Sequence, residues 1–131
     1  MMTPQELGSW GEKYVVNRLR ESGWVARYGG PADIQAINPD GVVLNVEIKA
    51  ARKGADKKWR ATLRKLGHTD HCKADYTIMV CLSKSVSFFV LPTPVIAERN
   101  HIVITSEPTS YRGRWAEFRQ ERIELCQDKL S

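Results

Sequence analysis

The sequence predicts a single α/β domain in which helices flank a mixed β-sheet. Three observations lead there: a capped amphipathic helix opens the chain, a segment at residues 42–50 alternates strictly over its second half, and an apolar run of strand length covers residues 76–82. The 131 residues are enough for one hydrophobic core, and a content of 42% hydrophobic and 27% charged residues is typical of a globular chain. We therefore assign residues 1–131 to one domain.

The first helix is predicted from its cap and its periodicity. Thr3 is placed as the N-cap, with Pro4 at the first helical position and Glu6 completing a capping box. Gly23 supplies the stop signal at the C-terminal end. Apolar residues recur between these ends at spacings of three and four: Leu7, Trp10, Tyr14, Val15 and Leu19.

Three strands are predicted next, at 24–28, 33–37 and 42–50. The last two are separated by an Asn-Pro-Asp-Gly turn at 38–41, which is typical of a hairpin. Because side chains in a strand alternate between its two faces, the third strand presents one apolar row to the core and one polar row to the other side. The apolar row is Val42, Leu44, Val46, Ile48 and Ala50, and the polar row is Asn45, Glu47 and Lys49.

The pattern is less regular after Arg52. Residues 53–58 read as a polar loop, residues 59–66 fit either a helix or a strand, and residues 69–71 suit the start of a short helix. Asp75 is expected to open a buried central strand at 76–82, which also places Cys81 in the core. The remaining predicted elements are a partner strand at 86–91, an edge strand at 102–105 and a charge-rich helix at 115–126.

Positive charge is concentrated in one segment. The chain carries a net charge of +5, whereas residues 49–65 alone carry +7, with Asp56 as their one acid. Such a cluster suits a polyanion, since phosphate neutralisation supplies most non-specific affinity for nucleic acids. The alternative is a solvated lysine-rich face. We expect phosphate contacts from Arg52, Lys53, Lys57, Lys58, Arg60, Arg64 and Lys65, and Trp59 either stacks on a base or packs in the core.

The cysteines and the N-terminal sequence lead us to expect a cytoplasmic protein. The three cysteines, Cys72, Cys81 and Cys126, form no disulfide framework, and no apolar run approaches a membrane span or a signal peptide. His68 and His71 lie close to Cys72, but no second ligand pair follows at zinc-finger spacing. We therefore expect neither a zinc site nor a membrane segment.

Asp33, Glu47 and Lys49 form the candidate catalytic cluster. If the strands at 33–37 and 42–50 pair as a hairpin, Asp33 lies beside Glu47, and Lys49 projects from the same face as Glu47. Two carboxylates and an amine can then act on one scissile phosphate. The alternative is that Glu47 and Lys49 form an ordinary surface ion pair, which contributes little to stability.

This arrangement resembles the PD-(D/E)XK nuclease superfamily, whose core is a helix, a three-strand meander, a second helix and a further strand (αβββαβ). The signature falls on Pro31-Ala32-Asp33 and on Glu47-Ile48-Lys49. The segments at 8–12 and 29–33 resemble archaeal-type Holliday junction resolvases. Two departures are that Ala32 separates the proline from the aspartate and that the second helix is indistinct. The resemblance implies a restriction-endonuclease-like α/β sandwich.

The resemblance also implies a ligand set. Mg²⁺, with Mn²⁺ as a substitute, would be held by Glu12, Asp33, Glu47 and the carbonyl of Ile48. The catalytic residues would be the three carboxylates together with Lys49, which would orient or deprotonate the attacking water. Gln35 and Asn45 would position the substrate on the same face.

We therefore expect a Mg²⁺-dependent DNA endonuclease that is selective for structure and acts on branched DNA. Cutting two strands with one site per domain implies a homodimer, and Trp115 and Phe118 offer either a dimer surface or core packing. Alternatives on the same fold are a sequence-specific restriction or homing-type endonuclease and a non-catalytic nucleic-acid-binding protein. A further alternative is an unrelated α/β protein.

Overall fold

The computed structural model describes residues 2–62, 74–84, 86–96 and 101–105. Several predictions fall outside this part of the chain: the short helix at 69–71, the helix at 115–126 with Trp115 and Phe118, and the residues Arg64, Lys65, His68, His71, Cys72 and Cys126. The described elements are α1 (Pro4–Glu21), β1 (Val25–Tyr28), β2 (Ile34–Ile37), β3 (Val43–Arg52), β4 (Lys58–Thr62), β5 (Tyr76–Leu82), β6 (Val86–Pro92), α2 (Thr93–Ile96) and β7 (His101–Thr105).

Helix α1 begins and ends where its sequence predicts. The Thr3 hydroxyl accepts a hydrogen bond from the backbone N–H of Glu6 at 3.1 Å, and the Glu6 carboxylate accepts one from the Thr3 N–H at 3.0 Å. This reciprocal pair satisfies two of the N–H groups that a helix start leaves open. Gly23 follows the C-cap with φ +88°, a backbone conformation that glycine adopts without strain. Within the described residues, no helix combines the length and apolar character needed to span a membrane.

The main sheet is mixed, as predicted, with the strand order β1-β2-β3-β5-β6. β1, β2 and β3 form an antiparallel meander, and the hairpin turn at 38–41 carries Gly41 at φ +85°. β3 then pairs with β5 in parallel, and β6 returns antiparallel to β5. β3 therefore lies at the centre of the sheet, where it joins the meander to the second half of the fold.

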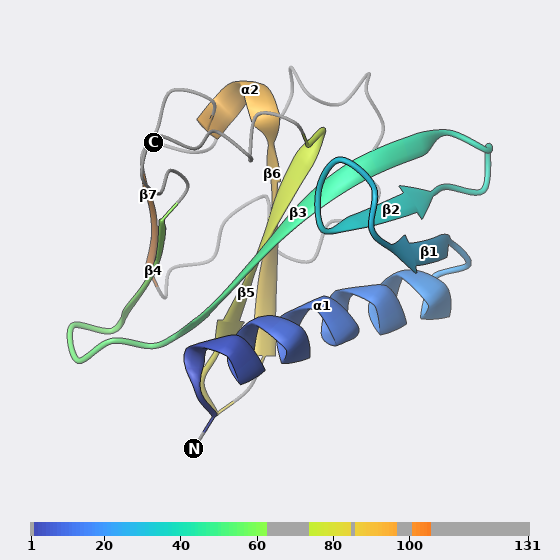
Figure 1. The fold of residues 1–131 in the computed structure, drawn as a ribbon. Coiled ribbons are helices and arrows are strands. Elements are labelled where there is room, and N and C mark those ends of the chain that lie inside the picture. The colour runs from blue at the N-terminus through green and yellow to red at the C-terminus, as the bar shows by residue number, and fades with distance from the viewer. Residues whose placement is uncertain (1, 63–73, 85, 97–100, 106–131) are drawn as a thin grey trace.

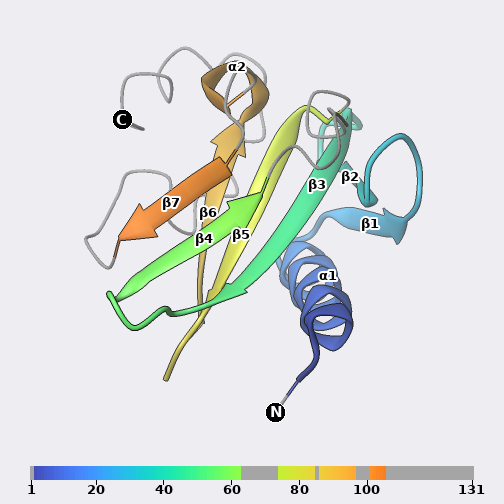
Figure 2. The ribbon, with the colours of Figure 1, turned by 60° about the vertical axis from the view of Figure 1, so that its left-hand side comes forward.

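Two hydrophobic layers cover the two faces of this sheet (Figures 1 and 2). Helix α1 packs on one face, where Val15 and Leu19 meet the even-numbered residues of β3 and β5, such as Val46 and Ile78. On the other face β4 and β7 form a two-stranded antiparallel sheet, and Trp59 and Ile104 pack there with Met79 and other residues of β5 and β6. The central sheet lies between α1 and the β4–β7 pair.

Four details of the fold correct or complete the sequence prediction. Val42 is 46% exposed rather than core-facing, because β3 starts at Val43 and Val42 still belongs to the turn. The described part of the ambiguous segment, residues 59–62, lies in a strand, β4, so the described part of the connection between β3 and β5 contains no second helix. The predicted edge strand exists as β7, but it pairs with β4 outside the main sheet. A short helix, α2, follows β6, and the sequence analysis did not predict it.

Gly11 allows α1 to approach β3 closely. A Cβ atom built on Gly11 would lie 2.8 Å from the Cβ of Ala50 and 3.8 Å from a methyl group of Ile48. The first of these distances is a clash with an atom that is fixed by the backbone of β3. Gly8 lies one turn earlier in the same helix, and a Cβ built there meets nothing within 4 Å.

These two glycines should respond oppositely to the same substitution. Gly11→Ala should lower the free energy of unfolding by about 1–3 kcal/mol, because the extra methyl group pushes α1 away from β3. Gly8→Ala should raise it by about 0.5–1 kcal/mol, because alanine is the better helix former and the site is open. Chemical denaturation of both variants checks this, and a stabilised Gly11→Ala variant would contradict the close contact between α1 and β3.

Candidate active site

Asp33 lies where β2 stops short of β3. The last residue pair between these strands is Ile34 with Val46, and beyond it this edge of β3 has no strand partner in the described structure. Asp33 supplies the hydrogen bonds to β3 at this point. Its N–H donates to the Val46 carbonyl at 3.1 Å, and its Oδ2 accepts from the Ile48 N–H at 2.8 Å. The carboxylate therefore lies alongside the Glu47-Ile48 peptide, as the hairpin prediction expected.

The carbonyl of Ile48 points to the same free edge. In a strand, the N–H and C=O of one residue face the same neighbour, and the Ile48 N–H faces Asp33. A backbone oxygen and a carboxylate thus border one position at the end of β2. Both are oxygen donors of the kind that hard divalent cations prefer.

Glu47 and Lys49 project from the opposite face of β3 to α1, as predicted. Their side chains form an ion pair with 3.5 Å between Lys49 Nζ and Glu47 Oε1. Glu47 is only 9% exposed and Lys49 is partly buried. This pair is therefore less solvated than an ordinary surface ion pair, and its burial is tolerated because each charge has a partner of opposite sign.

Glu12 approaches the same edge from α1. Its neighbour Gly11 lies directly over Ile48 and Ala50, which brings this turn of the helix onto β3. Burial raises the pKa of the Glu12 carboxyl above its usual value, and the nearby negative charge of Asp33 raises it further. The two carboxylates are therefore close enough for the charge of Asp33 to disfavour the ionised form of Glu12.

The residues present fit a hard divalent cation in their chemistry. The candidate ligands of Glu12, Asp33, Glu47 and Ile48 are all oxygen atoms. Among the residues that the structure describes, no three acidic, histidine or cysteine side chains are already grouped as a metal-binding set. Asp33 is held by the Ile48 N–H, and Glu47 by Lys49, so joint ligation needs rotation of these side chains.

Thr77 is a candidate that the sequence argument missed. It pairs in register with Glu47 across the parallel β3–β5 ladder and is fully buried, with an exposure of 0%. Its hydroxyl has no hydrogen-bond partner in the described structure, although buried polar groups are nearly always bonded. Because in-register residues of adjacent strands project from the same face, the Thr77 side chain lies on the same face of the sheet as Glu47. A single threonine within an apolar strand does not by itself indicate a functional residue. Its position beside Glu47 follows only from the register between β3 and β5.

Gln35 and Asn45 do share the face of Glu47, but they contact each other. The Gln35 side-chain amide donates to Asn45 Oδ1 at 3.3 Å, across the register pair that links β2 and β3. Asp75 precedes β5, as predicted, and its carboxylate accepts from the Asn45 N–H at 2.7 Å. These contacts hold the N-terminal ends of β3 and β5 together beside the cluster.

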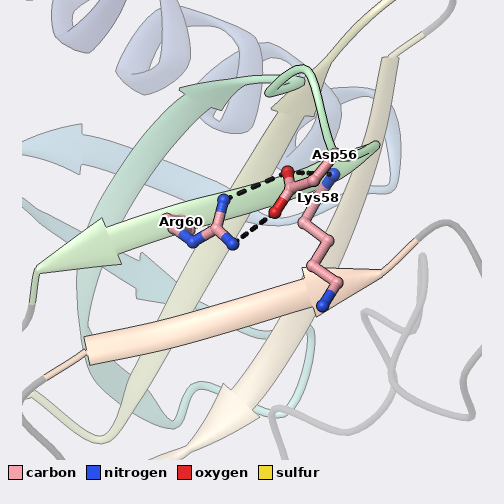
Figure 3. Close-up of polar contacts among 3 residues, drawn as sticks. All are labelled: Asp56, Lys58 and Arg60. Atoms are coloured by element: carbon pink, nitrogen blue, oxygen red, sulfur yellow. Dashed lines mark hydrogen bonds and ion pairs between the residues drawn. The ribbon is translucent and has the colours of Figure 1, made fainter.

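Several of the predicted phosphate contacts have intramolecular partners. Arg60 forms two hydrogen bonds with Asp56, at 3.1 and 2.5 Å, and Figure 3 shows the planar guanidinium facing that carboxylate. Arg52 donates to the Met2 carbonyl, and Lys53 lies 5.3 Å from the centre of the Trp59 ring. Lys57 and Lys58 are exposed. These two lysines are therefore the most available cations of the described basic segment.

Trp59 is a core residue. It is 6% exposed, packs in the cluster between the two sheets, and donates its indole N–H to the Leu82 carbonyl at 3.2 Å. Of the two roles left open for it, stacking on a nucleic-acid base is wrong, because the ring is covered. Cys81 is also buried in this cluster, as predicted.

Comparisons with known proteins give a partial sequence match and a match of the fold. No protein-family model matches the chain. Two curated proteins, both named UPF0102 protein and both from Bifidobacterium longum, one of them from subspecies infantis, are 38% identical to it over 58 residues. The match covers 39% of this chain and 46% of each relative, so it spans about half of their length.

One solved structure resembles nearly the whole chain. It is the bacterial homing endonuclease I-Ssp6803I, with a TM-score of 0.75, 16% sequence identity, and coverage of 97% of this chain and 99% of that chain. The similarity at this low identity concerns the fold. The chain therefore has a restriction-endonuclease-like α/β fold, as the sequence predicted.

Proposed function

We propose that this protein is a divalent-metal-dependent DNA endonuclease whose active site is formed by Asp33, Glu47 and Lys49, with Glu12 and the Ile48 carbonyl. The observation that carries the proposal is the contact of Asp33 with the Ile48 N–H, beside the partly buried pair of Glu47 and Lys49. A nuclease-like fold supports it, as does the homing endonuclease named above. Because a fold alone does not establish an activity, the proposal rests on the residues of the site.

Each residue has a distinct task in phosphodiester hydrolysis. A bound Mg²⁺ or Mn²⁺ would polarise the phosphate and lower the pKa of a water molecule. Asp33, Glu47 and the Ile48 carbonyl would hold that cation, and Glu12 would complete the set from α1. Lys49 would hold the attacking water by its ammonium group and offset the negative charge that develops on the phosphate.

The substrate we propose is DNA, with a preference for branched forms. Lys57 and Lys58 offer exposed positive charge next to β4, and no base-reading module is evident in the sequence. Cleavage of both strands requires two copies of the site, so we also propose a homodimer. A sequence-specific endonuclease is the alternative on the same fold, and it belongs in any test because the structural neighbour is a homing endonuclease.

The direct test is cleavage of labelled DNA in the presence of Mg²⁺. The panel holds a four-way junction, a flap, plain duplex, single-stranded DNA and a randomised duplex pool. The native protein should cut at least one of these, and Lys49→Ala should reduce the rate by about 100-fold or more, because the site loses its amine. Lys84→Ala removes an exposed lysine in the turn between β5 and β6 and should leave the rate unchanged.

Two outcomes would count against the proposal. Absence of cleavage of every substrate, the randomised pool included, would favour a non-catalytic binding protein if DNA is still bound. Equal cleavage by the native protein and Lys49→Ala would place the chemistry elsewhere. The preferred substrate in the panel distinguishes a branched-DNA enzyme from a sequence-specific one.

Thr77 has a positioning role in this proposal. Its buried hydroxyl would donate to the Glu47 carboxylate once that carboxylate turns from Lys49 towards the cation. Thr77→Val keeps the shape of the side chain and removes an unsatisfied hydroxyl, so we expect it to raise the free energy of unfolding by about 1 kcal/mol. The same change should weaken Mg²⁺ binding by about 5- to 10-fold, since a hydrogen bond to a charged group is lost.

Thermal unfolding with and without Mg²⁺ measures both effects on the same samples. Thr77→Ser retains the hydroxyl and serves as the control, which should recover most of the Mg²⁺ response. A Thr77→Val variant that is stabilised and responds to Mg²⁺ like the native protein would show that the hydroxyl has no part in the site.

A further inference from the structure

A small pocket lies between α1 and the end of β1, beside the candidate active site. It has a volume of about 230 Å³ and is lined by Ser9, Glu12 and Lys13 of the helix and by Tyr28 of the strand. None of these residues apart from Glu12 has a role in the chemistry described above. Figure 1 shows α1 and β1 next to each other at this side of the sheet.

Tyr28 is unusual for an aromatic residue in this fold. It is 53% exposed, while Ala26, on the same face of the same strand, is buried against α1. Gly29 and Gly30 follow it with φ values of +99° and +95°, and a Cβ built on Gly29 meets no atom within 4 Å. The chain turns at these two glycines directly after Tyr28, and the space beside Gly29 is open.

The pocket is connected to the active site through Glu12. This residue lines the pocket, and its carboxyl also feels the charge of Asp33, which raises its pKa. A ligand in the pocket would therefore lie next to the carboxylates that we assign to the cation. Within a substrate that spans both places, the group in the pocket would be close to the phosphate that is cut.

The chemistry of the lining suits one nucleotide. An exposed tyrosine ring can stack on a nucleobase, and the Lys13 ammonium can pair with an adjacent phosphate. The Ser9 hydroxyl and the Glu12 carboxylate can accept hydrogen bonds from base amino groups. The volume is below the roughly 300–1,000 Å³ that is usual for sites of larger organic ligands, which favours a single base.

We infer that this pocket receives an unpaired nucleotide next to the cut site, so that the substrate class is DNA with unstacked bases near the scissile phosphate. In an intact duplex, both faces of each base are covered by its neighbours, and Tyr28 has no face to stack on. Bulges, junctions and flaps expose such bases. This inference rests on the proposed endonuclease function and specifies its substrate.

The test uses the full chain with Lys49→Ala as background, so that DNA is bound in Mg²⁺ without being cut. One probe is a duplex with a single bulged 2-aminopurine, and the other is the same duplex fully paired with 2-aminopurine at the matching position. Stacking on Tyr28 should quench the fluorescence of the bulged probe. Adding Tyr28→Ala should abolish this quenching and raise the Kd for the bulged probe by about 5- to 150-fold, while the Kd for the paired duplex stays constant.

Two further variants make the result specific. Tyr28→Phe keeps the ring and should retain quenching and affinity. Val25→Ala removes a side chain of comparable exposure from the same edge strand and should change neither quantity.

The inference is overturned if adding Tyr28→Ala leaves the Kd for both probes at the values of the Lys49→Ala background. It is also overturned if Val25→Ala raises the Kd for the bulged probe as much as Tyr28→Ala does. Its failure can be told from failure of the proposed function. If the inference alone fails, Tyr28→Ala leaves the binding of the bulged probe unchanged while the native protein still cleaves DNA. If the background protein binds neither probe and the native protein cuts nothing, both proposals fall together.

Discussion

The contact between the Asp33 carboxylate and the Ile48 N–H is the interaction on which the candidate site depends. β2 begins one residue after Asp33, whereas β3 continues for six residues past its last partner on β2. The exposed edge of β3 needs a hydrogen-bond acceptor at Ile48, and Asp33 provides it at 2.8 Å. The unequal length of two paired strands thus brings a carboxylate to a position where the Ile48 carbonyl also faces the free edge of β3.

The packing on the two faces of β3 positions the other residues of the site. On one face, the missing side chain of Gly11 lets α1 pack against Ala50, and this packing brings Glu12 towards Asp33. On the other, the β4–β7 pair adds a second hydrophobic layer, in which Trp59 and Met79 pack, on the face from which Glu47 and Lys49 project. A strand covered on both sides is rigid, and rigidity is what a site that must hold its groups to within about 0.5 Å requires.

Local patterns predicted much of this arrangement, and long-range contacts account for what they left out. The cap of α1, the hairpin at 38–41 and the alternation around Glu47 are local signals, and they placed Asp33 beside Glu47 correctly. Thr77 became visible only through its register with Glu47, which joins positions 30 residues apart. The sequence could not decide between helix and strand for β4. This strand has five residues and pairs with the distant β7, so its own periodicity is weak. The pocket at Tyr28 depends in the same way on how α1 lies against β1.

The central claim is that these carboxylates form a cation site, and binding of Mg²⁺ and Mn²⁺ by the DNA-free protein tests it most directly. Isothermal titration of the native chain should give a saturable binding event, and Asp33→Asn should weaken it by at least about 10-fold, because one charged ligand is lost. Asp40→Asn, an exposed aspartate in the hairpin turn, is the matched control and should bind as the native protein does. If Asp33→Asn binds either cation as tightly as the native protein, the assignment of the site is wrong.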